Sequence, residues 1–105
     1  MNPKVIPMLS ARSGEPIRNQ YVIRTGKLYH FQSYDSLVAS YDASSRILTL
    51  GLYWDYSVTT MKYLNQFIRQ YCHPVHMKLP LGKSGADSIR KAIESGLVVY
   101  DERMV

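Results

Sequence analysis

Residues 53–60, YWDYSVTT, form the stretch richest in side chains that could bind or react, and an amphipathic pattern follows them at once. Ser57 is a predicted N-cap of that helix, because a hydroxyl oxygen accepts the free N–H groups of a first turn. Trp54 and Tyr56 alternate as in a strand, which predicts that they share one face and that Tyr53 lies on the other. Helix initiation explains the hydroxyls, and the aromatic rings remain as candidate binding groups.

Two further segments contain residue types of metal, nucleophile and phosphate sites. CHPVH, at 72–76, offers a cysteine and two histidines, but a zinc site needs a fourth ligand and a Cys-His pair needs a third group to orient the base. LGKSG, at 81–85, ends like a phosphate-binding loop, yet Met77 occupies the place of the glycine that this motif requires. Ser84 is better explained as the cap of a second helix. Since no pair of carboxylates suggests an acid and a base, we predict no enzyme, no metal and no cofactor.

Tyrosine content and charge distribution are the other unusual features. The chain has nine tyrosines and a net charge of +5, and its basic residues gather towards both ends of the sequence. Such a balance favours nucleic acid or an acidic protein surface. Exposed tyrosines beside cations can stack on the bases of single strands, although tyrosine rings also fill small cores. The candidate binding residues are Arg12, Arg18, Arg24, Lys27, Tyr34, Tyr53, Trp54, Tyr56, Lys62 and Arg69, and Lys4 and Tyr29 belong to the same hypothesis.

Length and composition predict a single soluble domain. The chain has 105 residues, of which 46% are hydrophobic and 20% charged, as in ordinary globular proteins. No run approaches the roughly 18 apolar residues of a membrane helix, and Pro7 interrupts the apolar residues near the N-terminus, so we expect no signal peptide and no membrane contact. Cys72 is the only cysteine, which excludes an internal disulfide.

The first half of the chain predicts an irregular arm followed by strands. Residues 1–18 contain three prolines and are expected to form an irregular basic arm, with one domain over residues 19–105. The runs at 19–25 and 27–33 flank a glycine, which is typical of a hairpin; there Tyr29 and Phe31 share a face that we expect to look into the core. The runs at 36–42 and 46–53 form a second pair around a polar turn. We therefore predict a four-stranded antiparallel meander.

The second half of the chain predicts two helices and a last strand. The main helix spans 57–71, with Gln66 on its polar side and an apolar stripe made of Met61, Leu64, Ile68 and Tyr71. A shorter helix is expected over 84–96, ended by a glycine, and a buried strand over 97–100. Helices segregated from an antiparallel sheet define an α+β fold, in the order β-β-β-β-α-α-β.

Three sequence strings carry a resemblance to a known family. They are Asn-Gln-Tyr from residue 19, Phe-Gln-Ser-Tyr from residue 31 and Trp-Asp-Tyr-Ser-x-Thr-Thr-x-Lys-Tyr from residue 54. With these strings the chain resembles, over about residues 19–100, a family of small phage and mobile-element proteins that carry a domain of unknown function. The resemblance implies neither catalytic residues nor a ligand. By size and style the chain is also similar to accessory proteins that phages use against host defences, including inhibitors of CRISPR effectors.

Two hypotheses about function follow from these observations. The first is a non-catalytic accessory protein that binds nucleic acid or a nucleoprotein complex of the host. The alternative is an inhibitor that binds a host defence nuclease, of the anti-CRISPR type, and acts by occlusion with tyrosines as anchors. Both place the protein in the cytoplasm of a bacterial host cell, and both leave a homodimer open.

Overall fold

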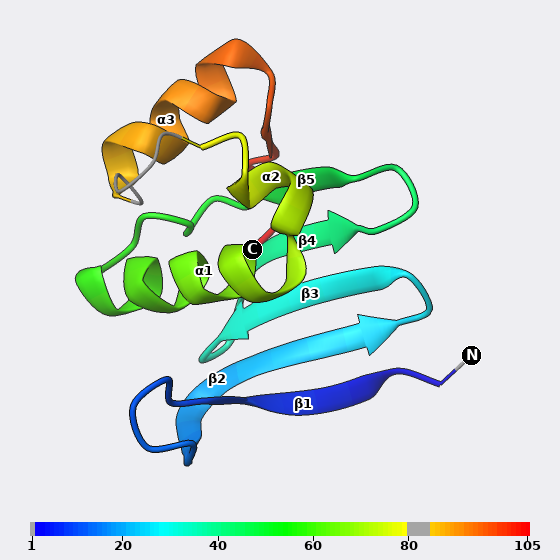
Figure 1. The fold of residues 1–105 in the computed structure, drawn as a ribbon, viewed down its shortest axis with the longest axis vertical. Coiled ribbons are helices and arrows are strands. Elements are labelled where there is room, and N and C mark those ends of the chain that lie inside the picture. Colours follow the sequence, from blue (N-terminus) through cyan, green and yellow to red (C-terminus); the bar gives the residue numbers. More distant parts are fainter. Residues whose placement is uncertain (1, 80–84) are drawn as a thin grey trace.

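The computed structural model describes residues 2–79 and 85–105, which form a sheet and helices (Figure 1). The strands are β1 (Lys4–Leu9), β2 (Pro16–Thr25), β3 (Leu28–Ser33), β4 (Ser36–Asp42), β5 (Ile47–Leu50) and β6 (Val99–Tyr100). The helices are α1 (Val58–Tyr71), α2 (His73–His76) and α3 (Ala86–Ser95). The strands lie side by side in sequence order; β1 to β5 are antiparallel neighbours, and β6 pairs with β5 in parallel. The predicted α+β fold is confirmed.

The strands of the predicted meander are present, and their turns use residues suited to them. Gly26 has a φ of 60° between β2 and β3, a conformation that glycine adopts freely. Between β4 and β5, Asp42 Oδ1 accepts a hydrogen bond of 2.9 Å from the Ser44 N–H, which is the turn chemistry expected of an aspartate. These turns keep consecutive strands adjacent.

Strand β1 corrects the prediction of an irregular N-terminal arm. Ile6 pairs with Val22 in the middle of a β1–β2 ladder, and Met8 is buried at 3% exposure. The prolines misled the prediction, because an edge strand tolerates Pro7 where a central strand would not. The same strand explains why Gln66 is buried instead of lying on a polar surface: its Nε2 donates a hydrogen bond of 2.8 Å to the Leu9 carbonyl.

The core lies between the sheet and α1, which crosses β3 and β4 (Figure 1). Phe31 on β3 stacks on Phe67 of α1 with ring centroids 5.7 Å apart, and Tyr29 packs on Tyr71 at 5.4 Å. The predicted inward face of β3 is therefore confirmed. Residues on the other face of the sheet stay accessible, and Val5 is 62% exposed.

The helices agree with the prediction at most of their ends. The Thr60 N–H donates a hydrogen bond of 3.0 Å to Ser57 Oγ, so Ser57 is the N-cap of α1. Gly96 ends α3 with a φ of 82°, whereas the predicted cap Ser84 lies outside the described residues. The short helix α2 was not predicted; Pro74 stands in its first turn, where the missing N–H costs nothing.

The last strand differs from the predicted buried strand at 97–100. Only Val99 and Tyr100 pair with β5, and they are 44% and 41% exposed, while Val98 is buried. A two-residue strand at the edge of a sheet has a neighbour on one side only. The apolar run therefore reflects one buried valine rather than a buried strand.

Candidate binding site

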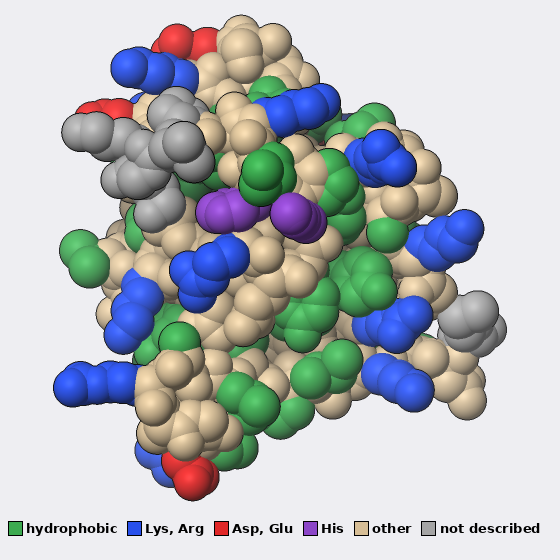
Figure 2. Space-filling model, in the orientation of Figure 1, with side chains coloured by type: hydrophobic (Ala, Val, Ile, Leu, Met, Phe, Trp, Pro, Cys, Tyr) green, Lys and Arg blue, Asp and Glu red, His purple; other side chains and the backbone are tan. Residues whose placement is uncertain are grey.

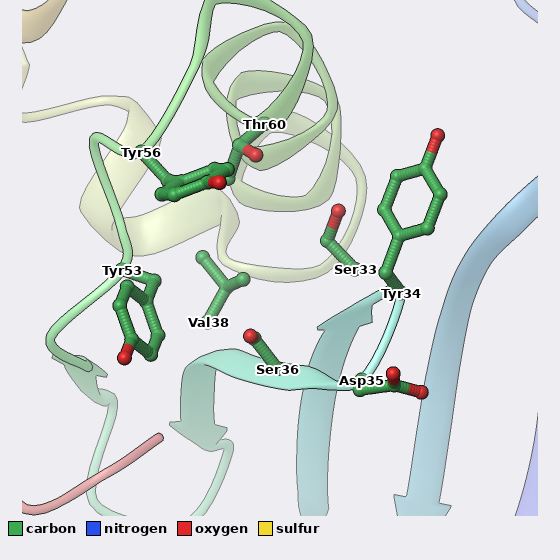
Figure 3. A pocket seen from close by; sticks show the side chains of 8 residues that line it. All are labelled: Ser33, Tyr34, Asp35, Ser36, Val38, Tyr53, Tyr56 and Thr60. Atoms are coloured by element: carbon green, nitrogen blue, oxygen red, sulfur yellow. The ribbon is translucent and has the colours of Figure 1, made fainter.

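Three tyrosines surround a pocket at the end of the sheet where the β3–β4 turn meets the start of α1 (Figures 1 and 3). The pocket has a volume of about 510 Å³, within the range of about 300–1,000 Å³ typical of small-molecule sites. We call it the tyrosine pocket, and its lining residues are Ser33, Tyr34, Asp35, Ser36, Val38, Tyr53, Tyr56 and Thr60. The prediction named Tyr34, Tyr53 and Tyr56 as binding residues, and the fold brings these rings together.

The β3–β4 turn holds Tyr34 in an unusual conformation. Its φ of 54° lies in the left-handed region, which residues with a side chain rarely adopt. The Tyr34 N–H donates to the Asn19 carbonyl at 2.7 Å, and the Tyr34 carbonyl accepts from Gln32 Nε2 at 2.8 Å. Both backbone groups are therefore fixed, and the ring remains 59% exposed.

Residues 51–57 form turns instead of the predicted strand, which changes where the aromatic rings point. The Trp54 N–H donates to the Gly51 carbonyl at 3.2 Å, and the Tyr56 N–H donates to the Tyr53 carbonyl at 3.1 Å. Tyr53 and Tyr56 consequently meet edge to face, with centroids 5.9 Å apart and planes at 87°. Trp54 points the other way and is 5% exposed. The prediction that Trp54 and Tyr56 share a face is wrong, and Trp54 belongs to the core.

Trp54 and Asp55 instead connect the turn to α3. The Arg90 guanidinium lies 5.5 Å from the centroid of the Trp54 ring, and it donates a hydrogen bond of 3.1 Å to Asp55 Oδ2. Asp55 is therefore paired with a cation from another helix. The pair holds the segment that carries Tyr53 and Tyr56 against the body of the protein.

The polar groups of the tyrosine pocket are hydroxyls and one carboxylate. Ser33 is buried at 5% exposure, and its Oγ has no hydrogen-bond partner among the described residues. Thr60 Oγ1 lies 3.0 Å from Ser57 Oγ, and the Asp35 side chain is exposed. None of the lining residues within the described ranges is a histidine, cysteine, lysine or arginine. Such a lining suits stacking and hydrogen bonding to a neutral ring better than acid–base chemistry.

Among the described residues, five basic side chains line two separate surface depressions. Lys4, Arg24 and Lys27 line a depression of about 400 Å³ beside the β2–β3 turn, and we call them the hairpin cluster. Arg12 and Lys62 line another, of about 290 Å³, between the β1–β2 loop and α1; we call them the loop cluster. Figure 2 shows lysine and arginine side chains towards the left and right edges of the molecule, with mostly hydrophobic and neutral atoms between them.

The loop cluster lies at the same end of the sheet as the tyrosine pocket. The β1–β2 loop, the β3–β4 turn and the start of α1 are all at the left of Figure 1, and the β2–β3 turn is at the right. Lys62 also approaches an aromatic ring, since its Nζ lies 5.4 Å from the Tyr63 centroid. In the hairpin cluster, Arg24 lies 5.4 Å from the Tyr29 centroid. Arg18 on β2 and Arg69 on α1 are exposed but line neither depression.

Within residues 2–79 and 85–105, the remaining reactive side chains form no second site. Burial raises the pKa of the Cys72 thiol, which disfavours the thiolate that nucleophilic or metal chemistry needs. His73 is exposed on α2 and His76 is half-buried. Among the described residues, no group of three or more His, Cys, Asp and Glu side chains is arranged to hold a metal ion.

The lining residues that sequence reasoning missed are small and polar. Ser33, Asp35, Ser36 and Thr60 are residue types common in turns and helix starts, so each alone indicates only local structure. Their position in the sequence is the signal that could have found them. The string SYDS occupies residues 33–36, between two predicted strands, and places a tyrosine in a turn. An aromatic residue there has no strand neighbours to cover it.

Comparison with known families gives one match. A model of a family of unknown function, DUF8033, matches residues 4–92. The chain belongs to this family. The match begins at the first residue of β1, so the segment predicted to be an arm is part of the family domain. No curated protein and no solved structure matches the chain.

None of the helices in residues 2–79 and 85–105 is long and apolar enough to cross a membrane.

Proposed function

We propose that this protein acts by binding nucleic acid, as a non-catalytic accessory protein of a phage or mobile element. The observation that carries the proposal is the convergence of Tyr34, from the β3–β4 turn, with Tyr53 and Tyr56 around one pocket. They are 59%, 38% and 76% exposed. Exposed aromatic faces are the platforms on which single-stranded nucleic acids stack.

The distribution of charge supports the same proposal. The loop cluster offers two cations at the end of the sheet that holds the tyrosine pocket, and the hairpin cluster offers three at the other end. Cations beside a stacking surface neutralise phosphates, and the counterions released make binding weaker at high salt. The net charge of +5 adds a long-range attraction for a polyanion.

A salt titration tests the proposal. We expect fluorescence anisotropy to detect binding to single-stranded DNA or RNA at low salt, and the affinity to fall steeply as salt is raised. The double variant Arg12→Gln/Lys62→Gln should bind more weakly and reduce the slope of log affinity against log salt by roughly 0.7 for each phosphate that is no longer neutralised. No binding to single-stranded DNA, duplex DNA or RNA at low salt overturns the proposal.

The matched control carries the same change in charge elsewhere. Lys78 and Lys91 are exposed and line neither basic depression. Lys78→Gln/Lys91→Gln should therefore retain most of the affinity. Equal losses in the two double variants would mean that net charge, not the loop cluster, determines binding.

A second candidate is an inhibitor that binds a host defence nuclease and occludes it. The open face of the sheet favours this candidate, because one cross-strand row on it is uncharged at neutral pH and not buried: Val5, Ile23, His30, Ser40 and Thr49. Uncharged, partly apolar faces suit protein partners. A stoichiometric protein recovered from nuclease-treated lysate by the wild type, and lost with Val5→Asp, would support inhibition.

A further inference from the structure

We infer that the tyrosine pocket binds one unstacked base of a single-stranded nucleic acid, with the phosphates lying outside it on the loop cluster. The inference rests on the proposed function and adds to it the group that is bound and a preference for single-stranded nucleic acid. It also assigns the base to the tyrosine pocket and the phosphates to the loop cluster. A base inside a duplex is covered on both faces by its neighbours. A pocket that takes one base therefore favours single strands over duplexes.

The arrangement of the rings fits a planar ligand. Figure 3 shows Tyr53 and Tyr56 on one side of the pocket and Tyr34 on the other, with Val38 between them. Because the Tyr53 and Tyr56 planes are nearly perpendicular, a flat ring that stacks on one of them lies perpendicular to the other. Both arrangements are favourable for aromatic pairs, since ring edges are positive and ring faces negative.

The Ser33 hydroxyl supplies a polar group with no partner in the described part of the protein. The residue is more than nine-tenths buried, at 5% exposure, and its Oγ is unpaired among the described residues. Figure 3 shows Ser33 between Val38 and Tyr34, with its hydroxyl directed towards the side of the pocket that α1 forms. A buried hydroxyl without a partner destabilises a fold, whereas one that meets a ligand contributes to specificity. The edge of a base presents the donors and acceptors that a hydroxyl can pair with.

The charges separate the base from its phosphates. Of the described residues that line the pocket, Asp35 alone is charged at neutral pH, and its carboxylate repels a phosphate. Cations lie outside it at the same end of the sheet, where Arg12 and Lys62 line a separate depression. A nucleotide thus finds an aromatic slot for its base and cations for its phosphates at one end of the sheet.

The backbone at Tyr34 keeps its ring at the pocket. Tyr34 is the first central residue of the two-residue β3–β4 turn, where a positive φ is required, and its φ is 54°. Its N–H and carbonyl groups are both hydrogen-bonded. The ring is more than half exposed, so it is available to a ligand.

Abasic oligonucleotides provide the test, because they keep the phosphates and lack the bases. We expect the wild type to bind a short oligothymidylate about 10-fold or more tightly than an abasic strand of equal length, a difference typical of one stacked base. Tyr56→Ala and Tyr34→Ala should bind the two strands alike. Tyr56→Phe, which keeps the ring, should discriminate as the wild type does.

Two further variants separate binding from folding. Tyr100→Ala removes an exposed tyrosine that does not line the pocket, and we expect it to bind both strands as the wild type does. Ser33→Ala should keep or raise the thermal midpoint and weaken the preference of the protein among oligonucleotides of the four bases. Thermal unfolding of every variant is measured to check that its fold is intact.

The outcomes distinguish this inference from the function on which it rests. Equal affinity of the wild type for thymidylate and abasic strands, or full discrimination by Tyr56→Ala, overturns the base pocket and leaves nucleic-acid binding in place. Absence of binding at low salt to either strand, to duplex DNA and to RNA overturns the proposed function and the inference together. Tighter binding to duplex than to single-stranded DNA also contradicts the inference.

Discussion

This protein has two clusters of aromatic rings, one buried in the core and one exposed at the surface. In the first, Phe31 stacks on Phe67 and Tyr71 packs 5.5 Å from the same Phe67 ring, all between the sheet and α1. In the second, Tyr53 and Tyr56 contact each other at 5.9 Å and leave much of their surface accessible. The chain moves from one environment to the other between Phe31 and Tyr34, where β3 ends.

The difference shows that position in the fold, more than residue type, decides what an aromatic ring does. Strand alternation turns every second residue of β3 towards α1, so a ring in that register is covered. A turn has no such alternation, and its rings point where local hydrogen bonds direct the backbone. Tyr34 is held by hydrogen bonds of its own backbone rather than by packing of its ring. The first cluster stabilises the fold, and the second is accessible to a ligand.

The largest expected effect is on the free energy of unfolding. Phe67 is completely buried, so Phe67→Ala should lower the free energy of unfolding by about 3–5 kcal/mol, through the loss of buried apolar surface and the cavity that remains. Tyr56 is 76% exposed, and Tyr56→Ala should change it by no more than about 0.5 kcal/mol. Urea denaturation followed by circular dichroism measures both. Similar losses of stability in the two variants would contradict the distinction between the clusters.

A smaller effect is expected at Gln66, on the side of α1 that faces β1. Its amide is buried and donates to the Leu9 carbonyl, so Gln66→Leu should lower the free energy of unfolding by about 1 kcal/mol, the usual net value of such a hydrogen bond. Gln70 is exposed on the same helix, and Gln70→Leu is the matched control. If both variants unfold at the same urea concentration, the attachment of β1 to α1 is not maintained by this hydrogen bond.

Sequence patterns predicted the elements whose signals are local. The stripe at Leu64 and Ile68 predicted the face of α1 that is buried, and Ser57 predicted its first turn. Patterns failed where the decision belongs to a distant segment. Strand β1 exists because β2 offers it a partner, and Gln66 is buried because β1 covers it; neither is visible within one window of sequence.

The candidate site divides in the same way. The tyrosines could be proposed as binding residues from their number and neighbours. Their assembly could not be predicted, since Tyr34 and Tyr56 are brought together by turns. Trp54 was assigned to the wrong face because residues 51–57 have the composition of a strand and the hydrogen bonds of turns. Ser33 could not be singled out, because an unpaired hydroxyl is a property of the packed structure.

The smallest expected effect concerns His30, which lies between the inward-facing Tyr29 and Phe31 on β3 and points to the open face. Burial lowers the pKa of His30 from its ordinary value of 6.5, and its Nδ1 is 2.5 Å from Ser40 Oγ. Below pH 6.5 the unfolded chain therefore binds a proton that the folded protein resists. The stability that depends on a neutral His30 is fully present above the pKa of this residue in the unfolded chain. It is lost as the pH falls from that value towards the lower pKa in the folded protein.

The titration of His30 thus tests whether the open face of the sheet is accessible to water in solution, as the pairing of the strands indicates. Thermal midpoints measured at about pH 7.5 and about pH 5.5 should fall slightly more for the wild type than for His30→Gln, because only the wild type carries this group through its titration range. Identical changes in the two proteins would mean that water reaches His30 as freely as in the unfolded chain. A protein partner bound over this face would bury His30 further and lower its pKa. The loss of stability would then still begin at the unfolded pKa but would become larger and extend to lower pH, so the same measurement on a complex distinguishes an occupied sheet face from an occupied tyrosine pocket.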